Sequence, residues 1–248
     1  MRSLSGKVAI VTGGSRGIGA AIAIRLAAEG AQVVVNYLQN QAAALEIVAR
    51  IQREGGKSNA IQADVSRAED VRRLFAEAVS AYGGLDILVS NAAQTHTRPV
   101  SIADTSDEVY ERFFDVNVRG TFLCLREAIR HIRPGGRIVT LSSSGTAAPH
   151  PGFSAYTAAK SAVEIFTQSL CKELRGRDVT VNCVSPGAIA TEQWLEGKPE
   201  EVLQRVAGLS PMNRIGEPVD VANVVAFLAG PESEWVNGQV LRVNGGFL

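Results

Sequence analysis

Two side chains that can exchange a proton lie four residues apart, the phenol of Tyr156 and the ammonium of Lys160. Side chains at this spacing share one face of an α-helix, so these two groups are expected to be neighbours. Ser143 precedes Tyr156 by thirteen residues and could place its hydroxyl across a gap from them. A phenol acidified by a nearby cation can give a proton to an oxygen or take one back, and a hydroxyl can hold that oxygen in place. The pattern predicts proton transfer at a carbonyl or alcohol oxygen.

A stretch near the start of the chain is suited to holding phosphates. Its glycines are Gly13, Gly17 and Gly19, in the pattern G-x-x-x-G-x-G rather than the general dinucleotide fingerprint G-x-G-x-x-G. A strand pattern precedes this loop and a helical pattern follows it, which is the context that a dinucleotide requires. The free N–H groups and positive dipole end of such a helix attract a pyrophosphate. Together, the loop and the proton-transfer residues predict carbonyl–alcohol redox chemistry.

The end of the second expected strand indicates which dinucleotide is bound. NAD-binding domains usually place an acidic residue there, which bonds the ribose 2′-hydroxyl. Here the strand ends in Val35, Asn36 and Tyr37, without a carboxylate. Arg16 lies in the glycine loop, where its guanidinium could meet a 2′-phosphate with several donors. We therefore predict NADP(H) in preference to NAD, the alternative being that Arg16 is a solvated loop charge.

Strand and helix patterns alternate along the 248 residues. Near-continuous apolar strands are typical of a parallel sheet that is covered on both faces. The expected strands are 8–11, 33–35, 58–61, 87–89, 137–141, 179–184 and 240–243, and the expected helices are 17–29, 42–54, 71–82, 109–131, 155–174 and 219–228. This alternation predicts a doubly wound α/β fold. Since no linker or repeat divides the chain, we expect residues 1–248 to form one domain, with a variable substrate loop at about 187–214.

Composition and charge are those of an ordinary globular protein. Hydrophobic residues make up 46% of the chain, and 25 basic residues balance 25 acidic ones, which argues against a broad nucleic-acid surface. No apolar run approaches the ~20 residues of a membrane span, and no apolar signal region precedes the first strand. The cysteines and histidines fit no metal or redox spacing. We expect a cytoplasmic protein with a small-molecule substrate and without a metal, nucleic-acid or membrane partner.

Several motifs recur in one order along the chain. They are Thr12–Gly19, Asp64-Val65, Asn91-Ala92-Ala93, Asn117, Ser143, Tyr156–Lys160 and Pro186-Gly187. On these motifs the chain resembles the short-chain dehydrogenase/reductase family over nearly its whole length, and most of all its 3-oxoacyl-carrier-protein reductases. Ala93 departs from the pattern, because the family usually has glycine there. Alanine should fit if the backbone at this position has a negative φ.

The resemblance implies a single-domain Rossmann fold, a doubly wound sheet of seven parallel strands with helices on both faces. It implies that Lys160 also bonds the nicotinamide ribose, and that Asn117 holds a water that relays protons outward. The catalytic residues expected are Asn117, Ser143, Tyr156 and Lys160. The residues expected to contact the cofactor are Gly13, Ser15, Arg16, Gly17, Ile18, Gly19, Asn36, Tyr37, Asp64, Val65, Asn91, Ala92, Ala93, Tyr156, Lys160, Pro186, Gly187, Ile189 and Thr191. The tail 237–246 resembles a segment that usually takes part in a homotetramer interface.

The substrate could be a ketone, a quinone, a sugar alcohol or a thioester linked to acyl-carrier protein, since similar enzymes act on all of these. Carrier-protein docking would require exposed cations near the cleft. Arg130, Arg133 and Arg177 are candidates, although the interpretation as solvated surface charges is favoured for them. The residues expected to bound the substrate pocket are Gln94, Thr95, His96, Gly145, His150, Phe153 and the span 187–214. Trp194 and Leu203 give that span apolar weight, so we expect it to close as a lid.

An alternative function is a catalytically silent NADP(H)-binding sensor or scaffold. The intact set of Asn117, Ser143, Tyr156 and Lys160 favours the enzyme, because a protein that only binds the cofactor has no need of these groups.

Overall fold

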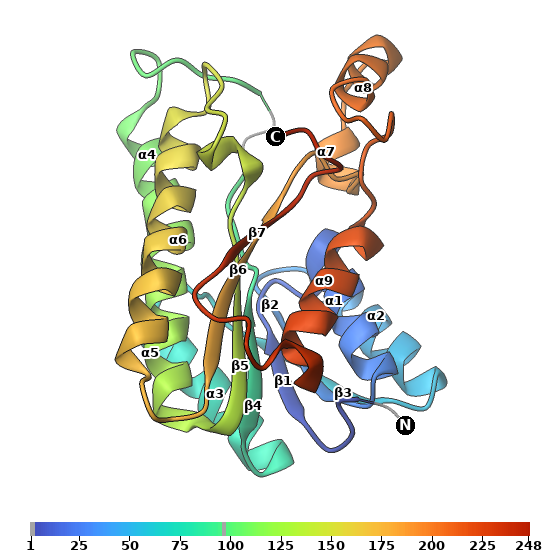
Figure 1. Cartoon of the computed structure of the whole chain (residues 1–248), viewed down its shortest axis with the longest axis vertical. Helices are drawn as coiled ribbons and strands as arrows, with labels where there is room; N and C mark the ends of the chain where they lie inside the picture. The colour runs from blue at the N-terminus through green and yellow to red at the C-terminus, as the bar shows by residue number, and fades with distance from the viewer. Residues whose placement is uncertain (1–2, 96–97) are drawn as a thin grey trace.

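The computed structural model describes residues 3–95 and 98–248, and its centre is one sheet of seven parallel strands (Figure 1). The strands are β1 (Val8–Val11), β2 (Gln32–Tyr37), β3 (Lys57–Gln62), β4 (Leu85–Ser90), β5 (Ile132–Leu141), β6 (Thr180–Pro186) and β7 (Val240–Val243). Their order across the sheet is β3-β2-β1-β4-β5-β6-β7, and every neighbouring pair is parallel. This arrangement confirms the predicted doubly wound Rossmann-type fold.

Helices cover both faces of the sheet (Figure 1). On one face lie α1 (Gly17–Ala28), α2 (Gln41–Arg53) and α9 (Pro218–Ala229), and on the other lie α3 (Ala68–Tyr82), α5 (Thr121–His131) and α6 (Ser154–Glu173). Successive strand residues point to opposite faces, so Val33 and Val35 enter one core while Val34 enters the other. Because both faces are buried, the strands read as continuous apolar runs.

The segment predicted as one helix over 109–131 has three parts. It begins with α4 (Asp107–Phe113), continues as the wider turns of η1 (Phe114–Gly120) and ends as α5. The wide turns are a short stretch inside a longer helical pattern, and that surrounding pattern leads the sequence to predict one continuous helix. Within η1, Gly120 lies against Val65, and a Cβ there would come within 2.9 Å of that valine's Cγ2.

The span 187–214 is more regular than its sequence suggests. It contains two short helices, α7 (Glu192–Leu195) and α8 (Glu200–Ala207), and neither has a fully buried residue. α7 has four residues and α8 has eight, which is too short for a periodic pattern to mark either one in the sequence. In Figure 1 both helices stand beyond the carboxyl ends of the strands, on the side of α9.

The chain reverses its winding direction between β1 and β4, which are neighbours at the centre of the sheet. Loops that leave two such strands diverge to opposite faces, so a crevice opens at their carboxyl ends. The glycine loop follows β1, and Asn91 follows β4. The topology therefore brings two predicted site segments to one crevice. No helix in the described part of the chain is long and apolar enough to span a membrane.

Candidate active site

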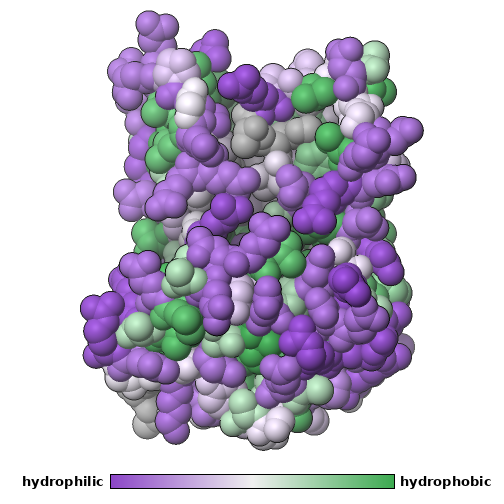
Figure 2. Space-filling model, turned by 180° about the vertical axis from the view of Figure 1, so that it is seen from behind, coloured by the Kyte–Doolittle hydropathy of each residue, from purple (hydrophilic) through white to green (hydrophobic). Residues whose placement is uncertain are grey.

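A cleft of about 1060 Å³ lies at the carboxyl ends of the strands. Ligand pockets usually measure about 300–1,000 Å³, so this one could hold a dinucleotide and a small substrate. Figure 2 shows the molecule hollowed in its upper part, between two groups of mainly hydrophilic side chains. The predicted residues on the cleft wall are Gly13, Ser15, Arg16, Gly17, Ile18, Gly19, Asn36, Tyr37, Asp64, Val65, Asn91, Ala92, Ala93, Tyr156, Lys160, Pro186 and Thr191.

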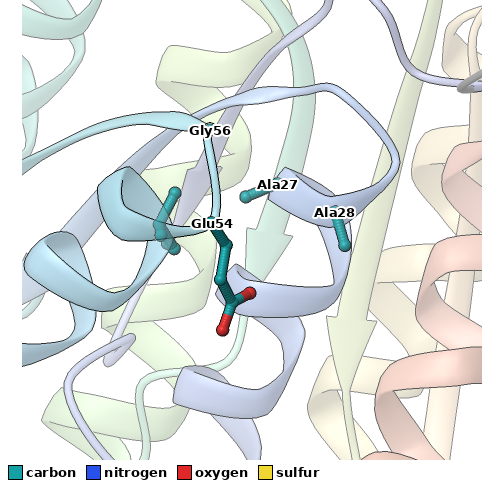
Figure 3. Close-up of a pocket in the computed structure, with 5 residues that line it drawn as sticks. Ala27, Ala28, Glu54 and Gly56 are labelled. Carbon is teal, nitrogen blue, oxygen red and sulfur yellow. The ribbon is translucent and has the colours of Figure 1, made fainter.

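A second hollow, at the amino ends of the strands, is too small to be the binding site of a dinucleotide. It measures about 100 Å³ and lies between the ends of α1 and α2, lined by Ala27, Ala28, Ile51, Glu54 and Gly56 (Figure 3). A volume this far below that of ordinary ligand pockets accommodates solvent but not a nucleotide. The large cleft is therefore the candidate site.

The glycine loop owes its shape to close packing. Gly17 has φ +55°, and a Cβ on Gly19 would meet the carbonyl oxygen of Gly13 at 2.2 Å. A side chain on Gly19 would therefore push α1 away from β1. Without one, the first turn of α1 faces the cleft with its backbone N–H groups, which is the arrangement that binds a pyrophosphate.

Two buried polar residues connect the loop to the sheet. The hydroxyl of Thr12 accepts hydrogen bonds from the backbone N–H groups of Asn91 (2.9 Å) and Ala92 (3.0 Å). The Asn36 side chain accepts from the N–H of Gly13 at 3.2 Å and donates to the carbonyl of Ala63 at 3.1 Å. The side chain of Asn36 therefore bonds the scaffold, and its predicted contact with the cofactor stays a prediction.

The end of the cleft beside β2 carries Arg16 and Asp64. Arg16 is the exposed N-cap residue of α1, and no described residue pairs with its guanidinium. Asp64 accepts hydrogen bonds from the backbone N–H (2.9 Å) and the hydroxyl (2.7 Å) of Ser66 through one oxygen. Ala93 has no positive φ, since Asp178 and Asn213 are the non-glycine residues with positive φ in the described ranges. Alanine therefore fits there, as predicted.

At the other end of the cleft, α6 presents Tyr156 and Lys160 on successive turns. Lys160 is 4% exposed, and its ammonium donates to the carbonyl of Leu141 at 2.8 Å. Burial lowers the pKa of Lys160 to about 8, while the nearby Cys183 acts in the opposite direction. Burial raises the pKa of Tyr156, and a hydrogen bond with Ser143 partly offsets that effect. The ring of Phe113 packs edge-on against Tyr156, with centroids 6.1 Å apart.

The three serines after β5 have different partners. Ser142 donates to the carboxylate of Glu164 at 2.6 Å, and Ser144 donates to the carbonyl of Ser185 at 3.2 Å. The hydroxyl of Ser143 accepts from the N–H of Gly145 at 3.3 Å and hydrogen-bonds Tyr156. Of the three, Ser143 is thus the one in contact with the phenol.

Asn117 lies in the wide turns of η1 and is fully buried. Its side chain accepts from the backbone N–H of Gln94 at 2.8 Å and donates to the Gln94 carbonyl at 3.0 Å. This paired bond fixes the loop after β4 against η1. The paired bond uses one lone pair of the Asn117 side-chain oxygen and one of its two N–H groups. The predicted water would bond the second lone pair or the second N–H.

Some predicted residues are not among those that line the cleft. They are Asn117, Ser143, Gly187 and Ile189 among the site residues, and Gly145, His150 and Phe153 among those expected to bound the substrate pocket. Gln94 and Thr95 are on the wall, and His96 lies outside the described residues. Glu192, Gln193 and Glu196, on the wall, belong to the span 187–214 that was expected to bound the pocket. The wall also includes residues that the sequence pattern did not single out, namely Leu38, Gln39, Asn40 and Arg112. No motif marks these positions, because tertiary packing alone brings them to the wall.

The cations suggested for carrier-protein docking are placed elsewhere. Arg130 pairs with Glu127 at 2.8 Å, Arg133 with Asp86 at 3.3 Å, and Arg177 donates to the carbonyl of Ile129 at 2.8 Å. They lie beside the amino ends of β5 and β6, which is the edge opposite the cleft. The expectation that they lie near the cleft was wrong, since each adjoins the start of a strand rather than its end. Residues 3–95 and 98–248 contain no cluster of three or more histidine, cysteine or acidic side chains arranged for a metal ion.

The fold and the crevice at its switch point define a dinucleotide-binding protein of the Rossmann class. A family model described as Enoyl-(Acyl carrier protein) reductase matches residues 13–248. A "Short-chain type dehydrogenase/reductase" of Picea abies is 47% identical, covering 98% of this chain and 93% of its own. An "NADPH-dependent aldehyde reductase-like protein, chloroplastic" of Arabidopsis thaliana is 46% identical, covering 99% and 95%. The crystal structure of a short chain dehydrogenase from Burkholderia cenocepacia in complex with NADP superposes with TM-score 0.93 at 39% identity, covering 99% of each chain.

The chain belongs to the short-chain dehydrogenase/reductase family.

The buried Lys160 predicts a pH dependence of stability. Its pKa of about 8 in the folded protein lies below the ordinary 10.5 that the unfolded chain retains, so the unfolded state binds more protons between about pH 8 and 10.5. The free energy of unfolding therefore rises with pH in this window. Relative to Lys160→Met, we expect the wild type to gain about 1 kcal/mol between pH 7 and 9, measured by urea unfolding. Lys172→Met, on the exposed part of α6, is the control, and a pH-independent difference for Lys160→Met would contradict the assignment.

Proposed function

We propose that this protein is an NADP(H)-dependent oxidoreductase that transfers a hydride between nicotinamide and a ketone or secondary alcohol, with Tyr156 as the general acid and base. The observation that carries the proposal is one continuous cleft whose wall includes both the glycine loop with Arg16 and the Tyr156–Lys160 pair. The NADP complex of the Burkholderia relative and the NADPH dependence of the Arabidopsis relative support the choice of cofactor.

The residues of the cleft fit a dinucleotide. The close approach at Gly19 leaves the first turn of α1 open to a pyrophosphate, and the unpaired Arg16 suits a 2′-phosphate. Asp64 and Val65 would border the adenine, and residues 91–93 would support the adenosine ribose. Pro186, Gly187, Ile189 and Thr191 would flank the nicotinamide, with Lys160 bonding its ribose. When bound, NADPH supplies the hydride, and the chain supplies the proton and the orientation.

Proton transfer would depend on Tyr156. Because burial raises the pKa of its phenol, the side chain stays protonated near neutral pH and is ready to act as an acid. As a substrate carbonyl is reduced, its oxygen gains negative charge and takes the phenolic proton. The buried ammonium of Lys160 would stabilise the phenolate that remains, and the hydroxyl of Ser143 would hold the substrate oxygen. A water on Asn117 would return a proton to the site by way of Lys160.

The substrate is proposed to be a small aldehyde or ketone that enters beside α7. The Arabidopsis relative is named an aldehyde reductase-like protein, which supports an aldehyde as substrate. Leu195 gives this part of the cleft wall an apolar side chain. Residues 187–214 would form the variable substrate loop of a single domain that comprises 1–248. The Lys198 ammonium lies 4.6 Å from the centroid of the Trp194 ring, a contact that would stiffen α7 as part of a lid. The reduced, unpaired Cys124 and Cys183 support a cytoplasmic location.

A homotetramer is proposed from the exposed apolar side chains. Tyr110, Phe122 and Ile165 project from α4, α5 and α6 with 48%, 47% and 60% of their surface exposed, and Trp235 is 99% exposed. Large exposed apolar side chains are typical of an interface between subunits. We expect sedimentation equilibrium to give the mass of a tetramer, and Phe122→Glu combined with Ile165→Glu to lower it to that of a smaller species. A monomeric wild type would contradict this proposal.

Tyr156→Phe tests the catalytic proposal. Removing the phenolic proton should lower kcat for NADPH oxidation by about 10²–10⁴-fold, because a general acid contributes that much. NADPH affinity, followed by cofactor fluorescence, should stay within about twofold of the wild type, since the ring remains. Before the variant is assayed, a panel of aldehydes, ketones and quinones is screened with the wild type to identify a substrate. Tyr82→Phe on α3 is the control variant. Retained turnover in Tyr156→Phe would refute the acid role, and tight NADPH binding without turnover by the wild type would favour a sensor or scaffold.

Arg16→Ala tests the choice of cofactor. A charge-assisted bond to a 2′-phosphate contributes about 1.5–3 kcal/mol, so NADPH should bind roughly 10–100-fold more weakly. NADH lacks this phosphate, and its affinity should change by less than about threefold. Both dissociation constants are measured by fluorescence titration, with Arg53→Ala at the exposed end of α2 as the control. Equal losses for the two cofactors would refute the assignment.

A further inference from the structure

The turn that carries Ser143 is bonded to α6 on both sides of that serine. On one side, the hydroxyl of Ser142 donates to Glu164 Oε1 at 2.6 Å, and on the other the hydroxyl of Thr146 donates to the same oxygen at 2.7 Å. Glu164 follows Lys160 by one helical turn, so its carboxylate lies on the side of α6 that faces β5. One carboxylate oxygen therefore spans the turn that presents the serine.

Both hydroxyls have weaker alternatives to this carboxylate. Ser142 lies 3.3 Å from the carbonyl of Lys160, and Thr146 lies 2.8 Å from the carbonyl of Ser143. Each hydroxyl has a single proton to donate, and a charged acceptor at a shorter distance makes the stronger bond. Glu164 is therefore the main partner of both, and it holds their oxygens in one place.

The remaining contacts of the turn leave it less constrained. The backbone N–H of Ser142 donates to the carbonyl of Val184 at 2.8 Å, and Ser144 reaches the carbonyl of Ser185 at 3.2 Å. These bonds tie the turn to β6, while Glu164 ties it to the helix that carries Tyr156. The distance between Ser143 and Tyr156 consequently depends on a bond between the turn and α6, and Glu164 provides two.

We propose that Glu164 is a positioning residue that holds the hydroxyl of Ser143 against the phenol of Tyr156. Glu164 acts on Ser143 and Tyr156 indirectly, through its hydrogen bonds with Ser142 and Thr146. The inference rests on the proposed function, in which Ser143 orients the substrate oxygen. A purely structural role would be limited to stability, whereas positioning affects the chemical step and depends on the presence of the Ser143 hydroxyl.

The experiment combines Glu164→Leu and Glu164→Gln with Ser143→Ala. Leucine removes the acceptor, while the glutamine carbonyl can still accept both hydroxyls. We expect Glu164→Leu to lower kcat about tenfold with KM changed less than about twofold, and Glu164→Gln to retain at least about a third of wild-type kcat. NADPH affinity, measured by fluorescence, should be unchanged in both variants. In the Ser143→Ala background, Glu164→Leu should change kcat by less than about twofold, because the positioned hydroxyl is already gone.

The matched control is Glu173→Gln, an exposed glutamate at the end of the same helix. If Glu164→Leu does not fold, the pair Ser142→Ala and Thr146→Val removes the two donors instead, with the same expected losses. A tenfold loss that persists in the Ser143→Ala background overturns the inference and leaves the proposed function intact. Full turnover by Ser143→Ala alone overturns the serine's role in the proposed function, and the inference with it.

Discussion

The burial of one ammonium group constrains the rest of the site. Lys160 is almost inaccessible, and its ammonium donates a hydrogen bond to the carbonyl of Leu141 at the end of β5. A buried cation without such a partner would be costly, so α6 can pack in only one register against this strand end. With that register set, the preceding turn of α6 places Tyr156 on the cleft wall, and the following turn places Glu164 over the serine turn. Lys160 thus positions the helix that carries Tyr156, the proposed acid.

The part of the cleft wall formed by the glycine loop and Asn91 is positioned by the sheet rather than by a helix. Because β1 and β4 are neighbours in a doubly wound sheet, the glycine loop and Asn91 leave the sheet at the same edge. Thr12 then joins the two loops through a single buried hydroxyl that accepts from two backbone N–H groups. The wall that would receive the phosphates is therefore built from backbone held by buried polar side chains. This explains why residues such as Asn36, which look like ligand contacts in the sequence, have their side chains engaged in the scaffold.

The sequence predicts best what depends on local periodicity. The β1–loop–α1 unit, the parallel strands and the Tyr156–Lys160 face of α6 follow from residue spacing, and the structure places them as predicted. The wide turns of η1 could not be predicted, because they are a short stretch inside a longer helical pattern. α7 and α8 are too short for a periodic pattern to mark them. The candidate docking arginines precede the strands predicted at 137–141 and 179–184, so the strand pattern already indicates the amino edge of the sheet for them. The partners of Ser142, Ser143 and Ser144 depend on α6 and β6, which are distant in sequence.

Burial acts on the two titratable groups of the site in opposite directions. It raises the pKa of Tyr156 and lowers the pKa of Lys160, and each shift favours the neutral form of its group. A neutral phenol is a proton donor, which suits the acid role that we propose for Tyr156. The hydrogen bond with Ser143 opposes the upward shift of the Tyr156 pKa. In our proposal Glu164 holds the turn of Ser143. The hydrogen bond that lowers the Tyr156 pKa therefore depends on a carboxylate that does not line the cleft.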